Sequence, residues 1–241
     1  MINIILCEGK TDAILLSYYL CKTAGWTVLK KAPKGIDIKP KNQNQSAFCY
    51  QRENDILLIC GVGGVTNFQK FIQDHIIQIM KNQRNISKVA IMVDRDDKAE
   101  NDLLNEIEQL FSPLLDNIAS NHWSHHTYMD AFEYEVSVDF LPLIIPQAQV
   151  GALETVLLNA IAEDPYDEKI VTQSQKFVNK IAPVADKYLH TRRMRLKAEL
   201  SVTWAIQSPD KAFVFIDEQL QSIPWENSQT LRECFTKLLE I

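Results

Sequence analysis

Residues 5–12 read Ile-Leu-Cys-Glu-Gly-Lys-Thr-Asp, and residues 89–96 read Val-Ala-Ile-Met-Val-Asp-Arg-Asp. Each stretch begins as a short apolar run and ends in acidic residues. Runs of this kind are typical of buried strands in a parallel sheet, whose ligands bind beyond the carboxyl ends of the strands. We therefore expect Glu8, Asp94 and Asp96 to lie near one another at one edge of a sheet.

Three acids at such an edge predict a site for a divalent metal ion. Mg²⁺ prefers carboxylate oxygen atoms, keeps several water ligands and often completes its coordination with substrate phosphates. This interpretation predicts Mg²⁺, or Mn²⁺ in its place, as the cofactor. The alternative is that Glu8 is a solvated acid at a strand end, and that Asp94 and Asp96 form a helix-capping turn.

The first 120 residues predict an α/β fold with a mostly parallel sheet flanked by helices. Short apolar strands alternate there with helical segments, as in sheets whose strands are joined by right-handed helical crossovers. A polar, lysine-rich stretch at 31–55 contains two prolines and a glycine, so we expect a long loop that faces the substrate. The expected strands are 2–7, 26–29, 56–60 and 89–93, and the expected helices are about 11–24, a helix after Gly64, and 99–115.

Beyond residue 120 the sequence predicts a mainly helical region. A strand expected within 134–140 is ended by Pro142 and Pro146, since proline lacks a backbone donor. We expect a metal-binding core at 1–125 and a mainly helical extension at 126–241 packed on it. The expected helices of the extension are 151–162, 168–181, 192–207 and 228–239.

Composition indicates a globular protein with unevenly distributed charge. The formal net charge is −6, so the chain lacks the overall positive charge of a non-specific nucleic-acid-binding protein. Residues 22–41 nevertheless contain six lysines and one aspartate, whereas residues 94–116 contain eight acids and two basic residues. An acidic pocket flanked by basic stretches suits a metal-dependent enzyme that acts on a polyanion. The alternative is that these charges lie on solvated faces.

Five cysteines without any Cys-x-x-Cys spacing indicate buried, reduced thiols. The first apolar run is too short for a signal peptide, and no stretch approaches the roughly 18 apolar residues of a membrane span. We therefore expect a cytoplasmic protein that does not enter a membrane.

Two further groups of residues have alternative interpretations. Three histidines lie close together in sequence, but no cysteine pair complements them as zinc ligands, so we expect them on the surface or in a loop. Four basic residues at a predicted helix start form either a nucleic-acid-binding face or a solvated one. These groups are His122, His125 and His126, and Arg192, Arg193, Arg195 and Lys197.

The residues beside the predicted acids are candidates for substrate binding. Gly61, Gly63 and Gly64 could present backbone N–H groups to a phosphate at the start of the next helix. They do not form a Walker loop, because no Gly-Lys-Ser/Thr follows, and a tight turn alone would also explain them. Lys10 could contact a substrate phosphate or be an ordinary exposed lysine.

Three motifs, in this order, resemble the Toprim domain of topoisomerases, bacterial primases and OLD-type nucleases. They are Glu-Gly-Lys-Thr-Asp at 8–12, Gly-Val-Gly-Gly at 61–64 and Asp-Arg-Asp at 94–96. The resemblance covers roughly residues 1–120 and is closest to the OLD-like branch and to small standalone Toprim proteins of unassigned function. In the standalone group a Gly-x-Leu-Glu helix follows the core, as residues 151–154 do here. The resemblance implies a Toprim-like, Rossmann-like sheet.

The resemblance also implies roles for individual residues. Glu8 would be the catalytic residue, as metal ligand or as general acid/base, and Asp94 and Asp96 would hold Mg²⁺. Asp12 stands where OLD-like nucleases carry a second acid for another metal, although its alternative is to cap a helix. Glu154 would belong to the site, unless it only compensates the charge of a helix N-terminus.

The implied function is that of a small Mg²⁺-dependent nuclease that cleaves DNA or RNA phosphodiesters. The sequence lacks the ATPase motif of full OLD proteins, so a separate ATPase chain is an expected partner, and apolar C-terminal helices could form a homodimer. One alternative is a non-catalytic module that binds nucleic acid or a nucleotide through a Mg²⁺ site. A small-molecule phosphotransferase or phosphatase fits less well, because such enzymes usually carry a nucleophilic aspartate at the position of Glu8.

Overall fold

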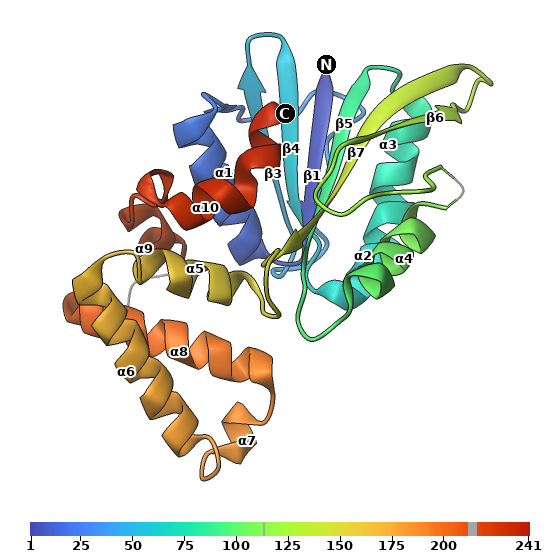
Figure 1. Ribbon diagram of the computed structural model, residues 1–241. Coiled ribbons are helices and arrows are strands. Elements are labelled where there is room, and N and C mark those ends of the chain that lie inside the picture. Colours follow the sequence, from blue (N-terminus) through green and yellow to red (C-terminus); the bar gives the residue numbers. More distant parts are fainter. Residues whose placement is uncertain (113, 212–215) are drawn as a thin grey trace. The chain divides into compact units, whose positions relative to one another are not determined.

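One seven-stranded sheet, in the order β2-β3-β4-β1-β5-β7-β6, organises the chain (Figure 1). The computed structural model describes residues 1–112, 114–211 and 216–241. The strands are β1 (Ile2–Cys7), β2 (Thr27–Val28), β3 (Ser46–Arg52), β4 (Asp55–Gly61), β5 (Ile86–Asp94), β6 (Ser124–Met129) and β7 (Glu135–Ile145).

The centre of the sheet is parallel. Strand β1 pairs in parallel with β4 on one side and β5 on the other, which places Cys7 opposite both Gly61 and Met92. Antiparallel pairs flank this centre, because β3 pairs with β4 and β6 pairs with β7 in that direction. The predicted α/β class is confirmed, and the antiparallel outer pairs were not foreseen.

The hairpin of β3 and β4 corrects the loop predicted at 31–55. Arg52 lies opposite Asp55, so only Glu53 and Asn54 connect the strands. Glu53 has a φ of 54°, the left-handed conformation that tight hairpin turns require. The irregular chain therefore ends at residue 45, and β3 begins at Ser46.

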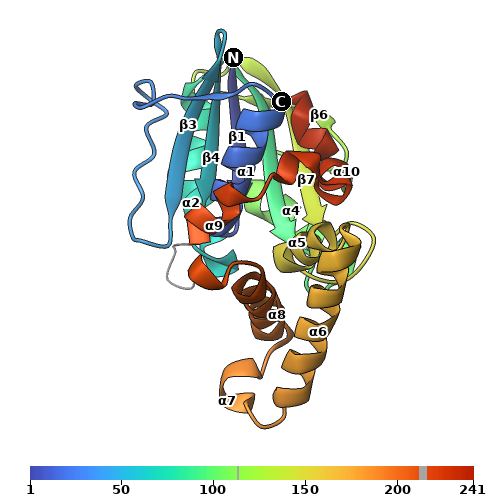
Figure 2. The same cartoon turned by 90° about the vertical axis from the view of Figure 1, so that its left-hand side faces the viewer.

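Helices cover both faces of the central strands. Helix α1 contacts β3 and β4, and it lies on one side of the sheet while α2, α3 and α4 lie on the other (Figures 1 and 2). Alternate strand residues such as Ile4 and Ile91 pack with Phe71 and Ile107 in one apolar core, as the two-residue period of a strand requires. These helices are α1 (Lys10–Thr23), α2 (Phe68–Phe71), α3 (Ile77–Asn82), which follows a π turn at Ile72–Ile76, and α4 (Glu100–Phe111).

The second half of the chain supplies a group of helices. Helices α6 and α8 pack against each other, and Val178, Ala182 and Leu189 form a small core there. Asp164 caps α6, accepting hydrogen bonds from Tyr166 and Asp167. The helices are α5 (Leu153–Ile161), α6 (Pro165–Ile181), α7 (Asp186–Leu189), α8 (Arg192–Gln207), α9 (Ile216–Ser222) and α10 (Gln229–Phe235), with 3₁₀ turns at Val65–Asn67, Pro209–Lys211, Trp225–Asn227 and Thr236–Glu240.

The chain divides into two compact units whose segments interleave. The sheet unit comprises residues 1–93, 98–144 and 236–241, and the helical unit comprises residues 94–97 and 145–235. This grouping differs from the division predicted at residue 125, because β6 and β7 complete the sheet.

Two expectations near the predicted division are corrected. Strand β7 continues through Pro142 to Ile145, since its pairing with β6 stops at Phe140 and the missing proline N–H breaks no bond of that ladder. Helix α4 ends at Phe111, and residue 113, inside the helix predicted at 99–115, lies outside the described residues.

All five cysteines are free thiols. Burial raises the pKa values of Cys60 and Cys234 to about 12, so these thiols stay protonated and unreactive. Cys7 is also buried, whereas Cys21 and Cys49 are half-buried. Across the described ranges, no helix combines the length and apolar character needed to cross a membrane.

Candidate functional site

The Asp-x-Asp turn after β5 is held by backbone hydrogen bonds within the helical unit. The N–H of Arg95 donates to the carbonyl of Ile145 at 2.7 Å. Asp96 and Gly151 exchange two backbone hydrogen bonds, of 2.6 and 3.0 Å, and Asp96 adopts a φ of 49°. The turn is thereby fixed against the segment that leads into α5.

Both carboxylate oxygens of Asp94 accept hydrogen bonds. The N–H of Leu153, the first residue of α5, donates to Oδ1 at 2.9 Å, and Arg193 Nη2 donates to Oδ2 at 3.0 Å. Asp94 is only 7% exposed, so these interactions replace water around a buried charge. Asp96 is more exposed, and its Oδ2 lies 3.8 Å from Arg193 Nη1. The guanidinium group of Arg193 therefore interacts with both acids.

The first turn of α8 supplies this arginine and the one before it. Thr191 caps the helix by accepting a hydrogen bond from the N–H of Met194. Arg192 pairs with Asp97 and also donates to the carbonyl of Val150 at 3.0 Å. Of the basic group predicted at 192–197, Arg193 thus binds the acids of the Asp-x-Asp turn and Arg192 binds the next residue, Asp97. Sequence reasoning missed these pairings, although the two blocks carry opposite charge.

Glu154 is the third predicted site acid that lies in the helical unit. It follows Leu153 in the first turn of α5. Its Oε1 lies 4.0 Å from Lys197 Nζ, whereas its Oε2 is buried and has no hydrogen-bond partner among the described residues. An orphaned buried carboxylate oxygen is costly unless a donor or a cation satisfies it. Glu154 is therefore a candidate ligand on structural grounds, in addition to the helix-terminus role.

Glu8 follows β1 in the sheet unit and is 4% exposed. Its carbonyl oxygen accepts hydrogen bonds from the N–H groups of Gly63 and Gly64, at 2.9 and 2.8 Å. These two donors are therefore engaged within the protein, which corrects the expectation that they face a phosphate.

Gly61 has a packing role in the same turn. A Cβ atom on Gly61 would lie 2.6 Å from the carbonyl oxygen of Gly9, so only glycine allows the two backbones to approach this closely. All three glycines of the predicted phosphate loop thus shape the turn around Glu8, although Gly63 and Gly64 do so through hydrogen bonds.

Asp12 and Lys10 begin helix α1. Gly9 is the N-cap of α1, and its N–H donates to Asp12 Oδ2 at 2.5 Å. The capping alternative for Asp12 is therefore the one that the structure shows, and its metal role stays a prediction. Lys10 is the exposed first residue of the helix.

The three histidines do not form a site together. His122 and His125 are exposed, as expected, whereas His126 is buried on strand β6, which corrects its expected place on the surface or in a loop. His125 Nδ1 lies 2.9 Å from Asp139, and His126 Nε2 lies 2.7 Å from Ser124 Oγ. Burial lowers the pKa of His126, so its ring is neutral at about pH 7. His122 Nδ1 contacts the carbonyl of Ser120 at 2.9 Å.

The strand register and the local contacts place the predicted acids in two groups. Glu8 and Asp94 stand at the carboxyl ends of the neighbouring parallel strands β1 and β5. Glu8 and Asp12 belong to the sheet unit, whereas Asp94, Asp96 and Glu154 belong to the helical unit. In the part of the chain that the structure describes, no three His, Cys, Asp or Glu side chains are arranged so that they could hold a metal ion.

The acids of the helical unit suit a hard divalent cation by their chemistry, although their side chains are not arranged around one in the structure. Asp94, Asp96 and Glu154 offer carboxylate oxygens, the ligands that Mg²⁺ and Mn²⁺ prefer, and Glu154 Oε2 is the orphaned buried atom among them. Arg193 balances the charge of two of these acids in the structure. A cation bound there would have to displace Arg193 as the positive charge next to these acids.

Comparisons with known proteins identify a family and a shared fold. The family described as "Protein of unknown function (DUF3226)" matches residues 2–236. The crystal structure of hypothetical protein PH0156 from Pyrococcus horikoshii OT3 superposes with a TM-score of 0.57 and 15% sequence identity, covering 99% of this chain and 98% of that one. At this identity the likeness shows a shared fold. No curated protein matches the sequence.

Proposed function

This chain belongs to the family of proteins of unknown function DUF3226, and from its site we propose a Toprim-type nuclease that hydrolyses nucleic-acid phosphodiesters with Mg²⁺. The observation that carries the proposal is the buried Asp94 in a fixed Asp-x-Asp turn at the end of a central parallel strand. The neighbouring strand β1 delivers Glu8 at the same end of the sheet. This arrangement agrees with the order of motifs in the Toprim resemblance.

In this proposal Asp94, Asp96 and Glu154 would hold the cation, and their side chains would have to move together around it, because they are not so arranged in the structure. Bound Mg²⁺ would polarise the phosphoryl oxygen and lower the pKa of a water molecule. The N–H of Leu153 donates a hydrogen bond to the Asp94 carboxylate, and this bond limits the rotation of the proposed metal ligand. The Asp96 side chain is 42% exposed, so a cation held there would be open to a phosphate from solvent.

Glu8 and Arg193 have roles that follow from their chemistry. Glu8 is proposed to move the proton of the attacking water, because a buried carboxylate is a suitable general base. Arg193 has a planar guanidinium group that suits either a carboxylate or a phosphate. It pairs with Asp94 and Asp96 in the structure, and it is proposed to shift its hydrogen bonds to the phosphodiester when a cation neutralises these acids.

One observation favours the alternative of a binding module that does not cleave. Arg193 already balances Asp94 and Asp96, so the turn needs no metal ion for charge balance. In that case nucleic acid or a nucleotide would bind without hydrolysis. A separate ATPase chain and a homodimer remain proposals for the context in which either function operates.

The test is a cleavage assay on fluorescent single- and double-stranded DNA and RNA with Mg²⁺ or Mn²⁺. Asp94→Asn and Glu8→Gln should each reduce cleavage at least a hundredfold, whereas Asp102→Asn, at an exposed acid in the first turn of α4, should not. Circular dichroism verifies that each variant is folded. Cleavage that persists in both site variants would exclude this site. A native chain that binds these nucleic acids without cutting any of them would support the binding module.

A further inference from the structure

A basic loop connects β2 to β3 on the sheet unit. Its residues 30–41 carry five exposed lysines and one exposed acid, Asp37. Lys41 pairs with Asp74 at 2.7 Å, but none of the other four forms an ion pair with a described residue. This local excess of positive charge contrasts with the net charge of −6 of the whole chain. The four lysines are Lys30, Lys31, Lys34 and Lys39.

The loop is anchored in its middle by two apolar side chains. Ile36 and Ile38 are 2% and 8% exposed and belong to the same core as the central strands. Because these two residues alternate with Asp37 and Lys39, their burial directs the charged neighbours towards solvent. The N–H of Ile36 also donates to the carbonyl of Pro33 at 3.2 Å.

Hydrogen bonds fix both ends of the loop. The N–H of Leu29 donates to the carbonyl of Cys49 at 2.8 Å, next to β2. At the other end Gln45 accepts a hydrogen bond from the N–H of Lys41 at 2.9 Å and donates to the carbonyl of Val62 at 3.3 Å. The lysines therefore stand on a folded segment, which loses less conformational entropy on binding than a disordered one.

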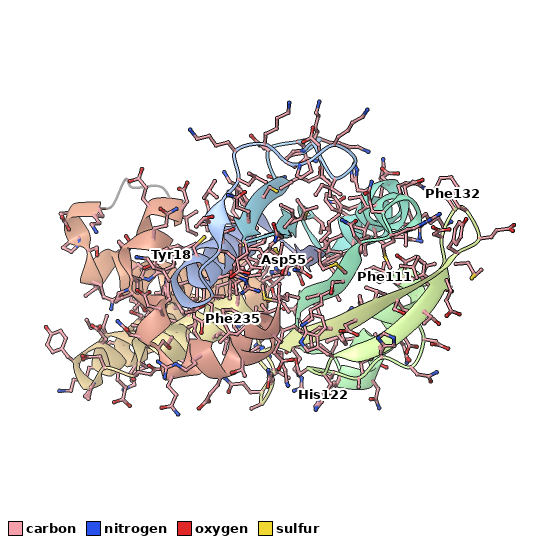
Figure 3. The ribbon with its side chains drawn as sticks, turned by 90° about the horizontal axis from the view of Figure 1, so that it is seen from above. Tyr18, Asp55, Phe111, His122, Phe132 and Phe235 are labelled. Carbon is pink, nitrogen blue, oxygen red and sulfur yellow. The ribbon has the colours of Figure 1, made fainter. Side chains whose placement is uncertain are left out.

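Figure 3 shows this loop projecting long side chains that end in nitrogen, away from the strands. The loop exposes no large apolar side chain, since its two isoleucines are buried. Insertion into a membrane interface would call for exposed apolar residues beside the lysines. An array of point charges without apolar contacts instead suits a polyanion whose charges repeat, such as a phosphodiester backbone.

We propose that the anchored basic loop, residues 30–41, binds the sugar–phosphate backbone of nucleic acid. The choice of nucleic acid rests on the proposed function, whereas the charge and the anchoring of the loop do not. Binding through lysines alone would not depend on base sequence, because phosphate contacts carry no sequence information. It would require no divalent cation.

The experiment measures fluorescence anisotropy of labelled single- and double-stranded DNA and RNA, in EDTA, over a series of salt concentrations. The test variant replaces Lys30, Lys31, Lys34 and Lys39 by glutamine. The matched control replaces four exposed lysines of the helical unit by glutamine, which changes the net charge equally. The control positions are Lys169, Lys176, Lys180 and Lys187.

We expect the loop variant to bind roughly ten- to a hundredfold more weakly at low salt, while the control binds like the native chain. The slope of log affinity against log salt should decrease in magnitude by roughly 3, as expected when about four phosphate contacts are lost. Equal losses in both variants, or no nucleic-acid binding by the native chain, would overturn the proposal. So would competition by poly-glutamate as strong as that by DNA of equal charge, which would assign the loop to acidic proteins.

Failure of this inference is distinguishable from failure of the nuclease. The binding measurement contains no divalent cation and leaves Asp94 unchanged, so it can succeed in a protein that never cleaves. Conversely, cleavage that depends on Asp94 and is insensitive to the four loop substitutions would retain the nuclease and reject the loop.

Discussion

The guanidinium group of Arg193 donates a hydrogen bond to the carboxylate of Asp94 at 3.0 Å and lies 3.8 Å from that of Asp96. The first turn of α8 is thus tied to the Asp-x-Asp turn by an interaction between residues 99 positions apart. Because Asp94 is buried, its negative charge needs such partners to be stable. The arginine therefore controls both the stability of the turn and its affinity for another cation.

Replacing this arginine should destabilise the protein when no divalent cation is present. Arg193→Gln should lower the free energy of unfolding by about 1–2 kcal/mol, a value reduced for the partial exposure of the arginine side chain. Urea unfolding in EDTA measures the change. Arg192→Gln is the matched control, since its partner Asp97 is largely exposed, and should cost less than about 0.5 kcal/mol.

The same variant should bind Mg²⁺ more tightly. A cation at Asp94 and Asp96 would no longer compete with the guanidinium group, so we expect roughly a three- to tenfold lower dissociation constant for Arg193→Gln, about 1 kcal/mol. Titration calorimetry with Mg²⁺ alone provides the measurement. Equal or weaker Mg²⁺ binding than in the native chain would mean that arginine and metal do not share these acids.

Gly151 should be essential for the position of Asp96. Its φ is 151°, and a Cβ atom would lie 2.4 Å from Thr155 Oγ1. Gly151→Ala should therefore lower the free energy of unfolding by about 2–3 kcal/mol. The double variant Gly151→Ala/Thr155→Ala removes the contacts with Oγ1 and Cγ2 but keeps the contact of 2.9 Å with the Cβ atom of residue 155 and the backbone strain, so thermal unfolding should show partial recovery. No recovery would place the whole cost in the backbone strain and this Cβ contact.

Glu163 should give the helical unit a measurable pH dependence. Burial raises its pKa, but hydrogen bonds from Thr230, Ser228 and Gln229 lower it more, so the net pKa lies below the ordinary value. The stabilisation is therefore complete above the ordinary carboxyl pKa and is lost as the pH falls through the lowered folded-state pKa.

The variant Glu163→Gln tests this dependence. It should lower the free energy of unfolding by about 1 kcal/mol near pH 7, as expected for the loss of an exposed cap at the start of α10. The decrease should be smaller near pH 3. Urea unfolding of both proteins at the two pH values gives the difference. A cost that does not depend on pH would show that the charge of Glu163 is irrelevant.

Gly61 should tolerate substitution less well than a glycine with free space. Gly61→Ala would place Cβ 2.6 Å from the Gly9 carbonyl oxygen, and we expect a loss of at least about 2 kcal/mol. Gly25→Ala is the control, because its Cβ would meet nothing within 4 Å and only the φ of 71° opposes it, at about 1 kcal/mol. Denaturant unfolding compares the two, and equal costs would contradict the close approach at Gly61.

The strongly apolar and strongly periodic elements could be predicted from the sequence. Strands β1, β4 and β5 follow from their apolar runs, and α8 begins and ends where its pattern predicts. Strands β3 and β6 could not be recognised, because they are rich in Ser, Cys, His and Thr and depend on pairing with a neighbour.

Only the acids of the candidate site could be predicted from the sequence. The turn at Asp94 and Asp96 has a local signature, an acidic motif directly after an apolar strand. Its arginine does not, because Arg193 reaches the turn from a distant helix, and only the opposite charge of the two blocks hinted at the pairing. The role of Gly63 and Gly64 was also hidden, since their partner is a backbone carbonyl, which no side-chain pattern reveals.

The interleaved segments of the two units have a consequence for synthesis on the ribosome. Residues 236–241 complete the sheet unit, where Trp123 Nε1 donates to the carbonyl of Lys237 at 3.0 Å and Arg52 Nη2 donates to that of Ile241 at 2.5 Å. The whole of residues 145–235 is translated before these contacts can form, which takes roughly 5–20 s at typical elongation rates. Until then Trp123 Nε1 and Arg52 Nη2 lack these acceptors, so the sheet unit is completed only by the last residues of this sequence.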